Sequence, residues 1–194
     1  MKRFLCALII ITAFAGMSYG ASNSELRRMS MFISNFVEVG MTDIDAGNIT
    51  DSELAYFGIW HNYRNNFKSR IQRCPDKDCP YGSLIIDKKY VAESVKKYFG
   101  LDMRHQSAEN ESMGHYDGRC YHFDGADGET AQARVFESSR RGNVITMKGE
   151  TYYPDNEDIE GESFTATARP YKYNGKDTWS ILTLKTEDAD SDSW

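Results

Sequence analysis

Residues 171–181 read YKYNGKDTWSI, and this stretch decides the fold more than any other in the chain. Asn174 and Gly175 stand between two runs in which apolar or aromatic residues alternate with polar ones. A two-residue turn of type I′ requires a positive φ at both central positions, which Asn and Gly tolerate. The stretch therefore predicts a β-hairpin, and with it an antiparallel sheet in the second half of the chain.

Other segments before this hairpin also have the composition of strands. Residues 133–136 (ARVF), 144–147 (VITM) and 164–168 (FTATA) are short and rich in residues that favour extended structure. Residues 116–119 (YDGR) indicate another tight turn, and an acidic loop covers 154–162. Together these segments predict an antiparallel sheet of five or six strands.

The first half of the chain has helical patterns instead. Apolar residues recur at helical spacing over 24–39, and this segment ends at Gly40. A second helix, expected over about 50–72, starts with Thr50 and Glu53 at the spacing of a capping box. A third is expected to begin at Asp87, a good N-cap residue, and to end at Gly100.

Helices that precede hairpin-linked strands are typical of an α+β domain. We therefore predict three N-terminal helices packed on a C-terminal curved antiparallel sheet of five or six strands. In this element order, and in the strand sequence GKDTWSIL at 175–182, the chain resembles the NTF2-like and cystatin-like groups of small secreted bacterial proteins. The resemblance implies a similar topology and transfers no catalytic residue, because those groups include enzymes, ligand carriers and interaction modules.

Residues 1–20 have the layout of a secretory signal peptide. Lys2 and Arg3 precede an apolar run of about eleven residues, and small residues occur near position 20. This run is too short for the roughly 20 residues that a membrane-spanning helix needs. The sequence thus predicts cleavage before Ala21, a periplasmic or secreted protein, and no transmembrane segment after the leader is removed.

The charge and length of the remaining chain limit the classes of partner. The formal net charge of the full chain is −6 and becomes 21 − 29 = −8 once the leader with Lys2 and Arg3 is removed. No cluster of Lys or Arg stands out, so a nucleic-acid partner is disfavoured. Residues 21–185 fit a single domain of ordinary size. Residues 186–194 (TEDADSDSW) are acidic and nearly free of apolar side chains, which predicts a disordered tail.

Three cysteines, Cys74, Cys79 and Cys120, remain once the leader is removed. In an oxidising compartment the close spacing of the first two predicts a disulfide that pins a turn, with Cys120 left over. A zinc site is the alternative for the pair, but structural zinc sites usually have two tight ligand pairs and only one is visible, so the disulfide is favoured. The histidines that a zinc site would recruit are His105, His115 or His122.

The segment DIDAGNITDSE at 43–53 has the ligand order of an EF-hand calcium loop. Asp43 and Asp45 occupy alternate positions, Gly47 suits the turn, and Glu53 closes the loop. The loop is one residue shorter than an EF-hand, and the capping box already accounts for Glu53. A capped connection between helices is therefore favoured, and calcium bound by Asp43, Asp45 and Glu53 is the alternative.

Trp60, His61 and Tyr63 form the densest run of chemically capable side chains. His61 would serve as a general base if a carboxylate oriented it, and Trp60 with Tyr63 would line a ligand pocket between helix and sheet. The structural interpretation is favoured, because His61 follows Phe57 by one helical turn and so falls at the edge of the core. No nucleophile or metalloprotease motif accompanies these residues.

With no catalytic motif, the sequence favours an exported, non-enzymatic domain that binds a protein of the cell envelope or outside the cell. Aromatic residues on the expected strands are compatible with such an interface. Two alternatives stay open at this point. One is a small-molecule-binding or enzymatic domain with a pocket near His61, and the other is a domain stabilised by calcium through the 43–53 loop.

Overall fold

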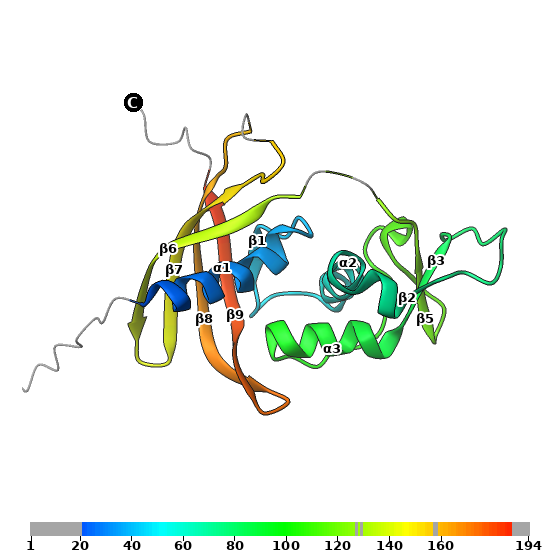
Figure 1. The fold of residues 1–194 in the computed structure, drawn as a ribbon. Coiled ribbons are helices and arrows are strands. Elements are labelled where there is room, and N and C mark those ends of the chain that lie inside the picture. Colours follow the sequence, from blue (N-terminus) through cyan, green and yellow to red (C-terminus); the bar gives the residue numbers. More distant parts are fainter. Residues whose placement is uncertain (1–20, 127, 129, 157–158, 188–194) are drawn as a thin grey trace, which may run out of the picture.

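The computed structural model describes residues 21–126, 128, 130–156 and 159–187. The predicted leader at 1–20 and most of the predicted tail, residues 188–194, lie outside the described residues. A large sheet stands at one end of the molecule and a small sheet at the other, with α2 and α3 between them (Figure 1). The α+β class is therefore confirmed, with three α-helices and two antiparallel sheets among the described residues.

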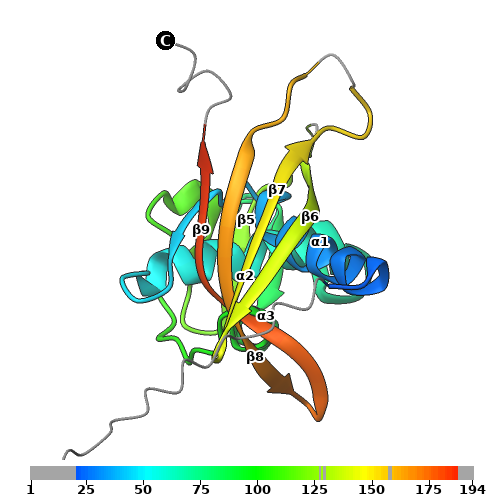
Figure 2. The same cartoon turned by 90° about the vertical axis from the view of Figure 1, so that its left-hand side faces the viewer.

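The large sheet has five strands in the order β1-β9-β8-β7-β6, and Figure 2 shows it from its open side. Its central hairpin joins β8 to β9 through Asn174 and Gly175, whose φ values are 49° and 76°, as the turn requires. The predicted hairpin is thus confirmed. The strands are β1 (Asp43–Asp45), β6 (Gln132–Arg141), β7 (Val144–Tyr152), β8 (Ser163–Tyr173) and β9 (Lys176–Glu187). β9 includes two residues that the sequence assigns to the tail.

Helix α1 (Asn23–Val37) packs beside β6, at the edge of the large sheet (Figure 2). The N–H of Ala133 donates to the hydroxyl of Ser34 at 2.9 Å, and the N–H of Val135 donates to the hydroxyl of Ser30 at 2.9 Å. These donors belong to an edge strand and would otherwise lack a neighbouring strand. Two serines of α1 therefore satisfy part of the sheet edge.

Helices α2 (Asp51–Arg70) and α3 (Lys88–Phe99) cross closely. A Cβ added at Gly58 of α2 would lie 2.8 Å from the carbonyl oxygen of Val91, so only glycine allows this approach. The capping box of Thr50 and Glu53 is present and confirms the predicted start of α2. Gly100, with φ 71°, ends α3 as predicted.

The second sheet was not expected from the sequence. It has four strands in the order β2-β3-β5-β4. The helix expected to reach residue 72 ends at Arg70, because Ile71 is extended and pairs with Ile86 of β3. The strands therefore form two sheets rather than one. Their bounds are β2 (Ile71–Arg73), β3 (Leu84–Asp87), β4 (His115–Tyr116) and β5 (Cys120–Phe123), and a short 3₁₀ helix, η1, covers Glu111–Met113.

One group of buried residues connects the helices with both sheets. Aromatic rings form its centre: Phe36 of α1 stacks on Phe57 of α2 at 5.2 Å and meets Phe99 of α3 edge-on at 5.5 Å. Ile86 and Tyr121 extend the same core into the small sheet. Among the described helices, none combines the length and apolar character needed to cross a membrane.

Candidate metal centre

The most reactive side chains of the molecule meet on the outer face of the small sheet. Side chains alternate between the two faces of a strand, and Tyr121 of β5 points inward to the core, so its neighbour His122 points outward. The loop between β2 and β3 carries Cys74 and Cys79, and it folds back over this outer face. The strand register and the loop therefore bring together residues more than 40 positions apart in the sequence.

Two thiols converge on one imidazole nitrogen. The Sγ of Cys79 lies 3.3 Å from Nδ1 of His122, and the Sγ of Cys74 lies 3.7 Å from the same atom. The three donor atoms all lie within 4.8 Å of one another, and each residue is half-buried. A single metal ion bound by all three would need only small shifts, because Zn–S and Zn–N bonds are about 2.0–2.3 Å long.

Asp117 orients the imidazole from the opposite side. Its Oδ2 lies 2.9 Å from Nε2 of His122, while its Oδ1 accepts hydrogen bonds from the N–H groups of Arg119 and Cys120 at 2.7 Å each. Because a carboxylate accepts, Nε2 carries the proton and the lone pair of Nδ1 faces the thiols. This is the arrangement of a carboxylate behind a metal-binding histidine.

The same contacts fix the charge of Asp117. Burial acts to raise the pKa of its carboxyl group, but hydrogen bonds from the Cys120 N–H, the His122 ring and the Arg119 N–H outweigh burial. The net effect lowers the pKa of Asp117 to about 2. Asp117 is therefore a carboxylate at neutral pH.

The predicted disulfide between Cys74 and Cys79 is a wrong prediction. Both cysteines are free thiols, as is Cys120. The physical reason is that each of the first two sulfurs is directed at the His122 nitrogen instead of at a bonding position about 2.05 Å from the other sulfur. The alternative that the sequence disfavoured, a cluster of Cys74, Cys79 and a histidine, is the one that the geometry supports.

Contacts on both sides hold the cysteine loop over the sheet. Asp124 accepts from the N–H and the hydroxyl of Ser83, each at 2.8 Å. The ring of Tyr81 stacks on the imidazole of His115 with centroids 3.5 Å apart. The loop is therefore tied to β4 and to the end of β5, which fixes where its cysteines lie.

Of the three histidines that a zinc site could recruit, only His122 joins the cysteines. Nδ1 of His105 hydrogen-bonds the Tyr121 hydroxyl at 3.0 Å, and His115 packs against Tyr81. Cys120 and His122 both line one cavity of about 390 Å³ beside the centre. Sequence reasoning missed Asp117, which it read only as a turn residue, although an Asp five residues before a histidine in a tight hairpin is within reach of that histidine.

The run of Trp60, His61 and Tyr63 does not form one site. His61 is buried between the rings of Phe57 and Tyr98, stacking on Phe57 at 5.4 Å. Burial, followed by the positive charges of Lys97 and Arg70, lowers the pKa of His61 to about 3, so it is neutral. Trp60 instead lines a separate cavity of about 460 Å³.

Tyr63 contacts Trp60 and packs edge-on against Phe123 of β5. Tyr63 therefore packs helix α2 against the small sheet.

The acidic side chains of the calcium-like loop are used locally. Asp45 accepts from the Gly47 N–H at 2.9 Å and from the Asn48 side chain at 2.6 Å. Glu53 accepts from the N–H and hydroxyl of Thr50 in the capping box. Asp43 lies on β1 opposite Lys185. The hydrogen bonds of Asp45 and Glu53 are those of a capped connection that leads into α2. Calcium binding by Asp43, Asp45 and Glu53 stays a prediction.

Comparisons with known proteins add no relative. No family model, no curated protein and no solved structure matches the chain. The resemblance to the NTF2-like and cystatin-like groups therefore stays a prediction, and the function must be argued from the residues alone.

Proposed function

We propose that the protein is an exported zinc-binding domain in which Cys74, Cys79 and His122 hold one Zn²⁺ ion. The observation that carries the proposal is the convergence of two thiols on the unprotonated nitrogen of an imidazole that Asp117 holds from behind. The export part rests on the predicted leader.

The chemistry of the donors selects the metal. Two thiolates and one imidazole are soft or borderline ligands, which suit zinc and do not suit calcium or magnesium. Zinc would also remove the thiol protons, since metal-bound cysteine is a thiolate. Three protein ligands leave the fourth tetrahedral position for water or another ligand.

A cysteine nucleophile is the competing interpretation, because Cys79, His122 and Asp117 form a relay of hydrogen-bond distances. Such a relay needs one thiol, and a single imidazole nitrogen can accept the proton of only one. Cys74 directed at the same nitrogen would have no role in it. A metal ion uses all three donors, which is why we prefer it.

Bound zinc would act as a crosslink. It would join the β2–β3 loop directly to strand β5 of the small sheet, across more than 40 residues of chain, in addition to the contacts that Ser83 and Tyr81 make. A ligand that binds only the folded state stabilises it in proportion to the logarithm of its concentration. The protein-binding role predicted from the sequence stays a prediction, and it is compatible with a zinc crosslink.

The test is zinc titration of the protein purified under reducing conditions and stripped with a chelator, using a chromophoric competitor to measure affinity. We expect one tightly bound ion per chain. Cobalt substituted for zinc should give intense thiolate-to-metal charge-transfer absorption. Cys74→Ser, Cys79→Ser and His122→Ala should each weaken binding by at least about 100-fold.

Two matched variants serve as controls. Cys120→Ser and His105→Ala change the same residue types outside the cluster and should keep wild-type affinity. Equal affinity in all five variants, or no stoichiometric binding, would overturn the proposal. So would a protein that retains full zinc binding after its Cys74 and Cys79 are blocked by alkylation.

A further inference from the structure

A second cavity lies on the other side of α2, far from the cysteines in the sequence. Its volume is about 460 Å³, within the range typical of small-molecule sites. It lies between the C-terminal end of α1, the middle of α2 and the β6–β7 side of the large sheet. Residues that line it include Glu38, Tyr56, Trp60, Arg64, Glu160 and Glu162.

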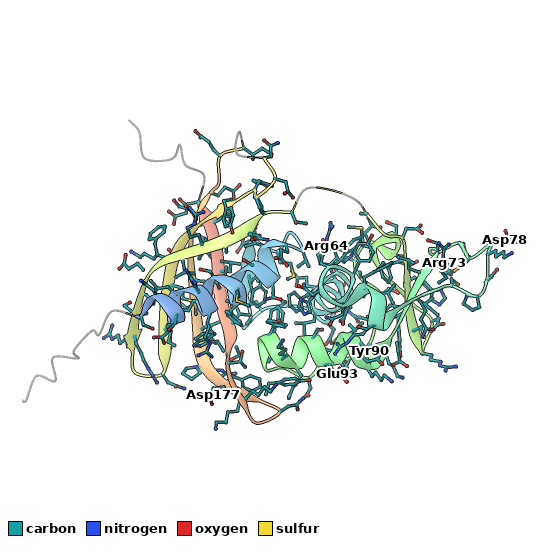
Figure 3. All side chains as sticks on the ribbon, in the orientation of Figure 1. Arg64, Arg73, Asp78, Tyr90, Glu93 and Asp177 are labelled. Atoms are coloured by element: carbon teal, nitrogen blue, oxygen red, sulfur yellow. The ribbon has the colours of Figure 1, made fainter. Side chains whose placement is uncertain are left out.

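Arg64 lines this cavity and forms no ion pair with any described residue. Its Nε is buried and has no hydrogen-bond partner among the described residues. Figure 3 shows Arg64 on the side of α2 opposite α3, and its guanidinium lies 5.7 Å from the ring centre of Tyr63. Because Nε is closed to a solvent-sized group, an anionic ligand would meet the rest of the guanidinium, which belongs to a residue that lines the cavity.

The aromatic walls present apolar surface. The Tyr56 hydroxyl donates to the carbonyl of Val39 at 2.9 Å, and the Trp60 N–H donates to the carbonyl of Met113 at 3.1 Å. The polar ends of both rings are therefore satisfied within the protein. What remains toward the cavity is ring surface suited to an apolar ligand group, and it comes chiefly from the half-buried Tyr56, because Trp60 is only 4% exposed.

Carboxyl groups provide the opposite charge. Glu38 is half-buried, and its pKa is raised by burial even though the side chain of Asn65 and the charge of Arg64 act to lower it. No ion pair joins Glu38 to Arg64 among those formed by the described residues. The cavity thus holds one cation and several carboxyl groups that do not neutralise each other directly.

We propose that this cavity binds a small zwitterion with an apolar side chain, such as a free amino acid or a short peptide. The ligand carboxylate pairs with the two terminal nitrogens of Arg64, a geometry that permits two parallel hydrogen bonds. The ligand ammonium group faces Glu38, and its side chain packs on Trp60 and Tyr56. This site is independent of the zinc proposal, since it shares no residue with the metal centre.

The experiment is isothermal titration of the whole protein with L-phenylalanine, L-leucine and L-alanyl-L-phenylalanine. Two analogues remove one charge each: L-phenylalaninamide lacks the carboxylate, and hydrocinnamate lacks the ammonium group. We expect saturable 1:1 binding of at least one zwitterion, and at least about tenfold weaker binding of its single-charge analogue.

Arg64→Gln should weaken binding of the zwitterion by at least about tenfold, because it removes the charge-assisted pair. Arg27→Gln, an exposed arginine on α1, is the matched control and should bind as the wild type does. No binding by any of the three zwitterions at millimolar concentration would overturn the proposal. Equal binding by the Arg64 variant or by the amide would overturn it as well.

Discussion

Asp117→Asn separates the role of the carboxylate in orienting His122 from its role in the turn. The amide oxygen of Asn can still accept from the N–H groups of Arg119 and Cys120, so the turn is kept. Its NH₂ group replaces the oxygen that faces Nε2 of His122. Two donors then face each other, and the imidazole must move its proton to Nδ1, where it blocks the lone pair that faces the thiols.

The expected loss is between tenfold and 100-fold in zinc affinity, the usual range for this kind of outer carboxylate, or about 1.4–2.7 kcal/mol. At a zinc concentration of about 1,000 times the wild-type Kd, zinc stabilises the wild type by about 4.1 kcal/mol and the variant by only about 1.4–2.7 kcal/mol. For a chain of this length 1 kcal/mol changes the melting temperature by about 2–4 °C. The zinc-dependent rise should therefore be about 8–16 °C for the wild type and clearly smaller for the variant.

The assay is thermal unfolding with zinc and with chelator, together with the competitor titration. Without zinc the two proteins should differ by about 1 kcal/mol or less, because the Asp117 side chain is 41% exposed and its pairing is screened. Asp124→Asn is the control, since Asp124 holds Ser83 of the same loop and does not face His122. If Asp117→Asn bound zinc as tightly as the control does, the orienting role of Asp117 would be refuted.

Two further predictions concern the core and the sheet edge. His61 is neutral in the folded protein and protonates at about pH 6.5 in the unfolded chain. Its contribution to the free energy of unfolding is therefore fully present above pH 6.5 and is lost as the pH falls toward 3. Between pH 7 and pH 5, the free energy of unfolding measured in urea should fall by about 2 kcal/mol more for the wild type than for His61→Phe. Parallel pH profiles of the two proteins would contradict the lowered pKa of His61. Ser34→Ala leaves the buried N–H of Ala133 without its acceptor and should cost about 1–3 kcal/mol in the same assay, whereas an unchanged midpoint would show that the edge is satisfied in another way.

The elements that could be predicted from the sequence are those fixed by near neighbours. Asn174 and Gly175 determine their turn through their own backbone preferences, and Thr50 with Glu53 caps α2 within four residues. Each signal is local, so no knowledge of the rest of the fold is needed. The same reasoning explains why the α+β class could be predicted.

The wrong predictions concern residues whose conformation depends on a partner far away in the sequence. Ile71 leaves the helix because it pairs with Ile86, and no local signal marks that pairing. Cys74 and Cys79 look like a local disulfide, yet the group that organises them is His122, more than 40 residues away. Only the register of β3 with β5 brings that histidine under the loop, so the metal centre could be listed from the sequence as an option but not preferred.

The serines of α1 also set the order in which the chain can complete its fold. Ser30 and Ser34 accept from backbone groups that lie 105 and 99 residues later in the chain. Contacts of such long sequence separation form slowly, because a large loop must close before they contribute. During synthesis, α1 therefore stays without its partner strand until β6 follows. A chain that ends before β6 would leave this helix unpaired, so the helical half alone is not expected to fold as the domain does.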